Sequence, residues 1–381
     1  MLNFAYCLPV NLIFGAGTVD QVGERTAPWG KKALFVTGGN SAQRSGLYDR
    51  VNEFLRKEGI ETVPFDQVEQ NPLTTTAEAG AVCAKQNGCD VVVALGGGSV
   101  MDCAKAIAFL ALNEGDINDY IYGRLNGDRA LPTILIPTTC GTGSEGNGFA
   151  VLTNPATGDK KSLRTPAILA KASIVDPACM TTLPKKVLAS VGFDAMCHAM
   201  EAYVSNGATP LSDPLALEAI ELAAESLPAL VTGEDESMEV WEKLTLASTL
   251  GGMVIGTAGV TLAHGMEHPA SGIRNIVHGQ GLAALTPTAI ETLLPGRPEK
   301  FARLSVLLGG TGAEDCADAV RELLSRIGLS VTLEELGIRE EDIPWMTENC
   351  LKVSAGNLAN TPVFVDATAI AGIYRRCLRR Q

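Results

Sequence analysis

The stretch that decides the fold reads Cys89-Asp-Val-Val-Val-Ala-Leu-Gly-Gly-Gly-Ser-Val-Met-Asp-Cys-Ala-Lys105. Residues 89–95 form a continuous, valine-rich run, which is typical of a strand buried on both faces. Three glycines and a serine follow, and a helical pattern begins directly after them. A buried strand, a tight turn and a helix together indicate a parallel sheet covered by helices on both sides.

The same alternation extends along the N-terminal half and then stops. Apolar runs predict strands at 32–37, 61–65, 89–95 and 131–137, and amphipathic patterns predict helices at 46–57 and 74–88. Beyond Leu183-Pro184 the chain is rich in Ala, Leu and Glu, which predicts helices at 214–230, 238–251 and 315–327. We therefore predict two domains: a Rossmann-like parallel-sheet domain of residues 1–183 and an all-helical domain of residues 184–381.

Composition excludes several classes of function. The 381 residues carry a net charge of −13, so neither a nucleic acid nor an anionic membrane is expected as a partner. The start of the chain lacks the pattern of a secretory leader, and no apolar run reaches the roughly 18 residues of a membrane span. The ten cysteines never form a C-x-x-C pair and are expected to be reduced thiols. We predict a cytoplasmic protein.

Two loops at strand ends suit a bound nucleotide. Gly97, Gly98 and Ser99 precede a helix, so backbone N–H groups and the helix N-terminus would favour a diphosphate there. The alternative is a helix capped by Ser99 with Asp102 three residues later. A second polar loop, 137–145, follows the strand at 131–137, and carboxyl ends of parallel strands are where α/β sheets bind ligands.

All four histidines fall within 81 residues: His198, His264, His268 and His278. Asp194 precedes His198 by four residues, and the same spacing separates His264 from His268, so each pair would share a helix face. Imidazoles with one carboxylate suit Fe(II), Zn(II), Co(II) or Ni(II). The alternative is a set of ordinary interior histidines, each hydrogen-bonded to a neighbour.

Taken together, these motifs resemble the iron-dependent, or group III, alcohol dehydrogenase family. The resemblance rests on Asn11-Leu-Ile-Phe-Gly-Ala-Gly17, Gly96-Gly-Gly-Ser-Val-Met-Asp102, Pro137-Thr-Thr-Cys-Gly-Thr-Gly-Ser-Glu145, Asp176-Pro177, Asp194-Ala-Met-Cys-His-Ala-Met-Glu-Ala-Tyr203, His264-Gly-Met-Glu-His268 and His278-Gly279. It implies a dehydroquinate synthase-like fold, a nicotinamide cofactor in the cleft between the two domains, a small primary alcohol, diol or aldehyde as substrate, and a homodimer.

The resemblance also implies roles for individual residues. One divalent metal, Fe(II) with Zn(II) as the alternative, would be bound by Asp194, His198, His264 and His278. His268 would lie near the substrate without being a ligand, and its imidazole makes it the candidate that relays the alcohol proton. The cofactor would contact Gly97, Gly98, Ser99, Asp102, Thr138, Thr139, Thr142 and, near the nicotinamide ribose, Lys160.

One turn departs from the NAD-preferring pattern of the family. Many members carry an aspartate after the first long strand, which binds the adenosine ribose and repels a 2′-phosphate; here Thr37 is followed by Gly38-Gly-Asn-Ser41. Gly38, Gly39 and Ser41 would donate to the phosphate, with Arg44 as a counter-charge. We predict that NADP(H) is preferred; the alternative is an ordinary strand-to-helix turn with NAD as the cofactor.

Four further alternatives stay open. Phe149 replaces a polar residue of some family members, and it either makes the substrate pocket more apolar or packs in the core. A sugar-phosphate cyclase of the dehydroquinate synthase type shares the glycine turn, but it needs basic residues for its substrate, and only Arg274 lies near the metal motifs. A glycerol dehydrogenase-like enzyme has fewer histidines at its metal. The fourth alternative is a protein that binds a nucleotide as a sensor and would turn over no alcohol or aldehyde.

Overall fold

The computed structural model describes residues 3–379. The chain forms two compact units. The sheet unit comprises Leu8–Thr157 and Lys161–Leu183, and the helical unit comprises Pro184–Gln381 with the short segments Met1–Cys7 and Gly158–Lys160. The predicted domain ranges, 1–183 and 184–381, assign both short segments to the first domain. Gly158–Lys160 groups with the helical unit because Asp159 is bonded to residues of that unit.

The sheet unit is built on six parallel strands in the order β1-β8-β5-β4-β2-β3. They are β1 (Leu12–Phe14), β2 (Lys32–Val36), β3 (Glu61–Phe65), β4 (Val91–Gly96), β5 (Thr133–Pro137) and β8 (Ala172–Val175). Four of these strands fall where the sequence predicts them. The short strands β1 and β8 were not predicted, since three or four residues are too few to give a readable pattern.

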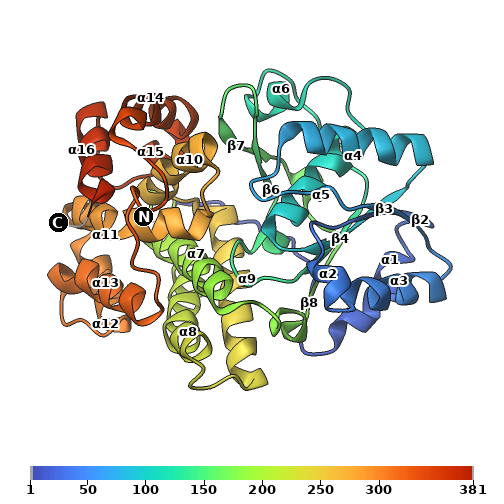
Figure 1. Ribbon diagram of the computed structural model, residues 1–381, viewed down its shortest axis with the longest axis horizontal. Coiled ribbons are helices and arrows are strands. Elements are labelled where there is room, and N and C mark those ends of the chain that lie inside the picture. Colours follow the sequence, from blue (N-terminus) through green and yellow to red (C-terminus); the bar gives the residue numbers. More distant parts are fainter. Residues whose placement is uncertain (1–2, 380–381) are drawn as a thin grey trace. The chain divides into compact units, whose positions relative to one another are not determined.

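Alternate residues of each central strand enter two different hydrophobic cores. Leu34, Val92 and Leu135 pack on the face that contacts α4 (Thr74–Asn87) and α5 (Gly98–Leu110). Phe35, Val93 and Ile134 belong to the other core, which includes residues of α1 (Val22–Thr26) and α3 (Leu47–Lys57). Helices therefore cover both faces of the sheet (Figure 1), which explains why β4 is apolar throughout.

The strand order reverses between β2 and β4. From β2 the chain moves outward to β3 on one side, and from β4 it proceeds to β5 and β8 on the other. In open α/β sheets, ligands bind at such a reversal, beyond the carboxyl ends of the two strands. The turns after β2 and β4 flank this position. The sheet unit also contains α2 (Ser41–Arg44), α6 (Ile117–Ile121) and the two-stranded sheet of β6 (Phe149–Thr153) and β7 (Lys160–Arg164), except for Lys160, which groups with the helical unit.

From Pro184 to Arg379 the described chain contains helices and no strand. The helices are α7 (Lys185–Val204), α8 (Ser212–Thr232), α9 (Met238–Ala258), α10 (Leu262–Arg274), α11 (His278–Leu293), α12 (Pro298–Leu307), α13 (Cys316–Arg326), α14 (Ile343–Val353), α15 (Ala355–Ala359) and α16 (Ala367–Leu378). The predicted fold class, a Rossmann-like sheet domain followed by an all-helical domain, is confirmed.

Helix α10 contains a proline, and side chains of neighbouring helices donate hydrogen bonds to the backbone carbonyls near it. Pro269 has no N–H to donate to the carbonyl of Gly265. The Cys350 thiol donates to that carbonyl at 3.2 Å, and the Tyr374 hydroxyl donates to the carbonyl of Met266 at 2.6 Å. These bonds fix the turn of α10 that follows His264.

No single helix of the described residues is long and apolar enough to cross a membrane. Only α9 and α10 taken together pass that test of length and composition, and they meet at a 103° bend.

Candidate metal and cofactor sites

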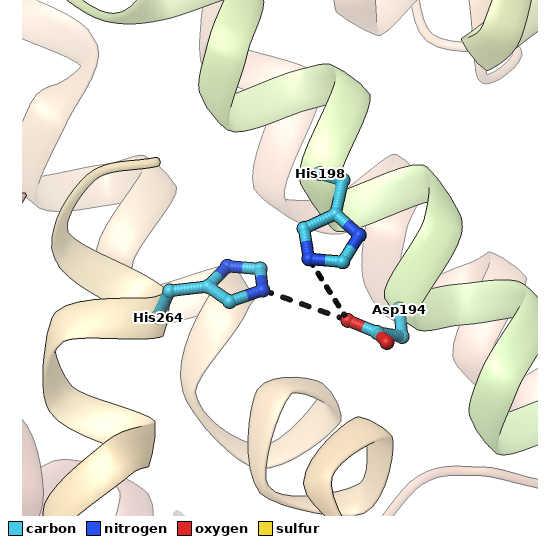
Figure 2. A group of neighbouring side chains, drawn as sticks. All are labelled: Asp194, His198 and His264. Atoms are coloured by element: carbon cyan, nitrogen blue, oxygen red, sulfur yellow. Dashed lines mark ion pairs between the residues drawn. The ribbon is translucent and has the colours of Figure 1, made fainter. Parts of the chain in front are cut away.

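Asp194 and His198 lie one turn apart on α7, as their spacing predicts, and both side chains are buried. His264 comes from α10 and points its imidazole toward the same carboxylate (Figure 2). His278 is the first residue of α11. Three helices of the helical unit therefore bring these four side chains together.

One oxygen of Asp194 lies at nearly equal distances from three imidazoles. Its Oδ1 is 3.6 Å from His198 Nε2, 3.5 Å from His264 Nε2 and 3.6 Å from His278 Nε2. These distances are too long for hydrogen bonds. Tetrahedral ligands about 2.1 Å from a metal ion are roughly 3.4 Å from one another, so the spacing matches the edges of a metal coordination polyhedron.

Two of the atoms that face this centre are buried and have no hydrogen-bond partner among the described residues. They are Asp194 Oδ1 and His264 Nε2. Burying a carboxylate oxygen without a partner is costly, and coordination to a cation removes that cost. The donor set of one carboxylate and neutral imidazoles fits Fe(II) or Zn(II) and does not fit Ca(II) or Mg(II).

Behind two of the imidazoles lie carboxylates that the sequence patterns did not single out. Glu201 Oε1 accepts from His264 Nδ1 at 2.5 Å, and Glu267 Oε2 accepts from His278 Nδ1. Both glutamates are buried. A signal was present in the sequence, since each glutamate follows a histidine of the cluster by three residues. On a helix this spacing places the two side chains on adjacent turns.

The buried charged groups of this cluster carry an excess of negative charge. Asp194, Glu201 and Glu267 are carboxylates, and the ammonium of Lys160 lies 3.5 Å from Glu267. Three anions and one cation leave two negative charges in excess. Buried charge is tolerated when it is compensated, so a divalent ion or protons on the histidines must balance this excess.

The acid–base properties of the ligands follow from the same arrangement. Burial opposes the charged form of His264, but Glu201 and Asp194 outweigh it and raise the pKa of His264 to about 10. Burial lowers the pKa of His198 to about 4, although Asp194 opposes this shift. Burial also works against ionisation of Asp194, but His198 and His278 hold its pKa well below the ordinary value. A cation bound at this centre would therefore compete with a proton for His264.

His268 stands apart from the Asp194 oxygen. Its ring centroid is 6.3 Å from that of His264 and 5.8 Å from that of His278. Burial lowers the pKa of His268 well below its ordinary value, and the charge of Lys160 adds to the shift. The imidazole is therefore neutral at neutral pH. His268 also forms a compact group with Glu267 and His278, in which the Glu267 carboxylate is already bonded to His278 and faces Lys160.

The predicted cofactor residues of the sheet unit meet at the carboxyl ends of neighbouring strands. A Cβ atom added to Gly98 would lie 2.2 Å from Thr142 Cγ2, and one added to Gly97 would lie 3.0 Å from Thr139 Oγ1. The two loops are thus in direct contact, and at position 98 a side chain would force Thr142 to move. Thr138 follows β5 directly, and its N–H donates to the carbonyl of Gly96. Lys160, by contrast, belongs to the helical unit.

The start of α5 distinguishes the two interpretations of Ser99. Gly97 is the N-cap residue and makes no side-chain cap, so Ser99 lies inside the first turn and does not cap the helix. The N–H groups of Gly98 and Ser99 precede the first hydrogen bond of the helix, whereas the Val100 N–H donates to the Gly97 carbonyl at 3.0 Å. Asp102 is engaged within the protein: Oδ1 accepts from Ser144 Oγ at 2.5 Å and Oδ2 from the Val151 N–H at 3.0 Å.

Known proteins resemble the chain over its whole length. The family model described as iron-containing alcohol dehydrogenase matches residues 9–177, and the C-terminal model of the same family matches residues 188–378. The 1,3-propanediol dehydrogenase of Klebsiella pneumoniae is 36% identical over 98% of both chains. The chain belongs to the iron-containing alcohol dehydrogenase family.

Other members of this family are similarly close. The NAD-dependent methanol dehydrogenase of Bacillus methanolicus is 34% identical over 92% of this chain and 94% of its own length. The crystal structure of an archaeal halo-thermophilic Red Sea brine pool alcohol dehydrogenase bound to NZQ has a TM-score of 0.94 at 34% identity, covering 99% of this chain and 100% of that one. The predicted enzyme class, an NAD(P)-dependent alcohol dehydrogenase, is confirmed.

In this member of the family, the turn after β2 is closely packed around glycine. A Cβ atom on Gly38 would lie 2.6 Å from the carbonyl oxygen of Val68 and 2.9 Å from Val100 Cγ2. Gly39 has a φ of 55°. Ser41 and Arg44 begin and end the short helix α2, and both are exposed.

Phe149, for which the sequence left open a place in the substrate pocket or in the core, is half-buried. Phe149 begins β6, and the guanidinium of Arg164 lies 4.6 Å from the centre of its ring.

Proposed function

We propose that this enzyme interconverts a small primary alcohol or diol and its aldehyde, using one divalent metal ion bound by Asp194, His198, His264 and His278. We further propose that it prefers NADP(H) to NAD(H). The observation that carries the metal assignment is the set of three Nε2 atoms at 3.5 to 3.6 Å from one unpartnered carboxylate oxygen. The relatives named after 1,3-propanediol and methanol support a small alcohol as substrate.

A bound cation supplies Lewis acidity toward the substrate oxygen, and the nicotinamide gives or accepts a hydride. The residues of the chain bind and orient both groups. Asp194 and the three imidazoles hold the cation in place. Gly97, Gly98 and Ser99 offer backbone N–H groups to the cofactor diphosphate, with Thr138, Thr139 and Thr142 beside them.

Two of the predicted cofactor contacts also have partners within the protein. Asp102 contributes to the cofactor site in the same motif, where its carboxylate also holds Ser144 and the backbone of Val151. Lys160 approaches the nicotinamide ribose while its ammonium balances the charge of Glu267.

The proton of the alcohol passes through His268. This imidazole lies beside the ligands His264 and His278, and burial keeps it neutral at neutral pH. A neutral imidazole is able to accept the proton of a substrate hydroxyl and pass it on.

The preference for NADP(H) rests on the turn after β2. The packing around Gly38 leaves no room for a side chain, so the carboxylate that repels a 2′-phosphate is absent. Gly38, Gly39 and Ser41 would donate to the phosphate, and the exposed guanidinium of Arg44 would neutralise it. The NAD-dependent methanol dehydrogenase among the relatives represents the opposite preference within the family.

Steady-state kinetics test the proposed function. We expect protein that contains stoichiometric iron or zinc to consume NADPH at 340 nm with short-chain aldehydes, and to have a higher kcat/KM with NADPH than with NADH. A higher kcat/KM with NADH would reject the cofactor preference alone. No turnover with any aldehyde or alcohol, in metal-loaded protein, would reject the dehydrogenase activity and favour a nucleotide sensor.

The cyclase alternative has little support in the helical unit. Arg274, the basic residue nearest the metal motifs in the sequence, donates to both oxygens of Asp342 at 3.0 and 2.6 Å, so it is occupied. From the family resemblance alone we infer a homodimer, which light scattering on the purified protein would test.

A further inference from the structure

Each of two candidate metal ligands has a buried carboxylate on the side of its ring away from Asp194. The Nδ1 of His264 bonds to Glu201, and the Nδ1 of His278 bonds to Glu267. In both rings the other nitrogen, Nε2, faces the oxygen of Asp194. The two carboxylates thus stand in equivalent positions around the centre.

Both carboxylates are fixed by their own partners. The second oxygen of Glu201 accepts from the N–H of Thr261 at 2.7 Å and from its hydroxyl at 2.8 Å. The second oxygen of Glu267 accepts from the Ser271 hydroxyl. Neither glutamate is free to turn away from its histidine. The third imidazole differs, because His198 Nδ1 is buried with no hydrogen-bond partner among the described residues.

A carboxylate at Nδ1 determines which nitrogen of the ring carries the proton. It holds the Nδ1–H, leaves the lone pair on Nε2, and increases the electron density that the imidazole offers to a cation. The geometry assigns this role to Glu201 and Glu267, which are positioning residues that orient His264 and His278 toward the metal ion. This inference rests on the metal site of the proposed function.

The two carboxylates are not equivalent in charge. The ammonium of Lys160 lies 3.5 Å from Glu267 Oε2 and 3.4 Å from His278 Nδ1, so it offsets part of the negative charge behind His278. The Glu201 carboxylate is bonded to His264 and Thr261, and neither partner carries a permanent positive charge. Glu201 should therefore contribute more to metal affinity than Glu267.

Cobalt binding to metal-free protein tests this assignment. We would measure the Kd for Co(II) by competition with a chelating dye, and the visible absorption of the bound ion, in wild type, Glu201→Gln and Glu267→Gln. Glutamine keeps an oxygen that accepts from Nδ1 but removes the charge. We expect Glu201→Gln to weaken binding by about 10- to 100-fold and to shift the cobalt spectrum, with a smaller change for Glu267→Gln.

Two further variants separate positioning from general destabilisation. Asp342→Asn also neutralises a buried, ion-paired carboxylate of the helical unit, but Asp342 bonds to Arg274 and touches no histidine of the cluster; its cobalt affinity should equal that of wild type. Thr261→Val removes one hydrogen bond to Glu201 without changing a charge, and it should weaken binding in the same direction as Glu201→Gln, but less.

The outcomes distinguish failure of this inference from failure of the proposed function. If wild-type protein binds no cobalt with one-to-one stoichiometry, the metal site itself is rejected. If wild type binds cobalt while Glu201→Gln and Glu267→Gln bind it equally well with unchanged spectra, the positioning role is rejected. An equal loss in Asp342→Asn would also overturn the inference, because the loss would then not depend on contact with a histidine.

Discussion

At the scale of single residues, the four histidines divide into two kinds. His198, His264 and His278 surround one oxygen of Asp194, whereas the ring of His268 lies beside those of His264 and His278, with centroids 6.3 and 5.8 Å away. Spacing along the sequence does not make this distinction, since His264 and His268 are a pair with the same i, i+4 separation as Asp194 and His198. The distinction becomes visible only in the fold, where His278 at the start of α11 is the third imidazole that faces Asp194.

This division predicts different effects of two alanine variants. Asp194→Ala should lose its bound metal, because the only anionic ligand is removed. His268→Ala should keep its metal and lose about 10²-fold or more in kcat, the usual contribution of a group that transfers a proton. Metal analysis and steady-state kinetics on both variants provide the measurement. Metal loss in His268→Ala as large as in His264→Ala would make His268 a ligand.

At the scale of elements, α5 holds the loop that carries the predicted cofactor threonines. Lys105 is fully buried, and its ammonium donates to the carbonyls of Ser144, Asn147 and Phe149 at 2.8, 3.2 and 2.5 Å. Its Nζ also lies 3.8 Å from Asp102. One helix thereby fixes the backbone that follows Thr138–Thr142.

Replacing Lys105 by methionine should destabilise the sheet unit. The change keeps the apolar stem but leaves Asp102 buried without its cation, which typically costs about 3–5 kcal/mol. Urea unfolding followed by circular dichroism would measure the loss, and the KM for the cofactor should rise. Lys85→Met, on the exposed face of α4, is the matched control. Equal unfolding midpoints for the two variants would contradict the role of Lys105.

Elements with a strong sequence pattern could be predicted, and those defined by tertiary contacts could not. The strands β2, β4 and β5 are largely apolar and bounded by turn residues, and the histidines are rare enough that their clustering stands out. Glu201 and Glu267 were not found, because glutamate in a helix is most often a solvated surface residue. The docking of Gly158–Lys160 in the helical unit was not predicted either, since it depends on contacts such as that of Asp159 with Asn349.

At the scale of the whole molecule, stability should depend on pH through the excess charge of the metal cluster. The pKa of His264 is raised to about 10, so in metal-free protein its proton stabilises the fold below pH 6.5. That contribution is lost as pH rises toward 10, where the folded state releases the proton. Metal removal should therefore lower the unfolding temperature more at pH 9 than at pH 6.5.

Calorimetry of zinc-loaded and metal-free protein at the two pH values checks this prediction. The difference in Tm between the two forms is expected to widen with pH in wild type. In metal-free His264→Gln the Tm should fall less between pH 6.5 and pH 9 than in metal-free wild type, because the group that binds the proton is gone. If the Tm difference between zinc-loaded and metal-free wild type stays constant or becomes smaller from pH 6.5 to pH 9, His264 does not carry the proton.

The central claim is that one divalent ion binds among Asp194, His198, His264 and His278. Anomalous diffraction from crystals of the metal-loaded protein, collected on both sides of the absorption edge of the metal, tests it most directly. The account predicts one peak per chain, about 2.0–2.2 Å from the Oδ1 of Asp194 and the Nε2 atoms of the three histidines. A peak among Glu267, His268 and His278, or no peak within reach of Asp194, would contradict it.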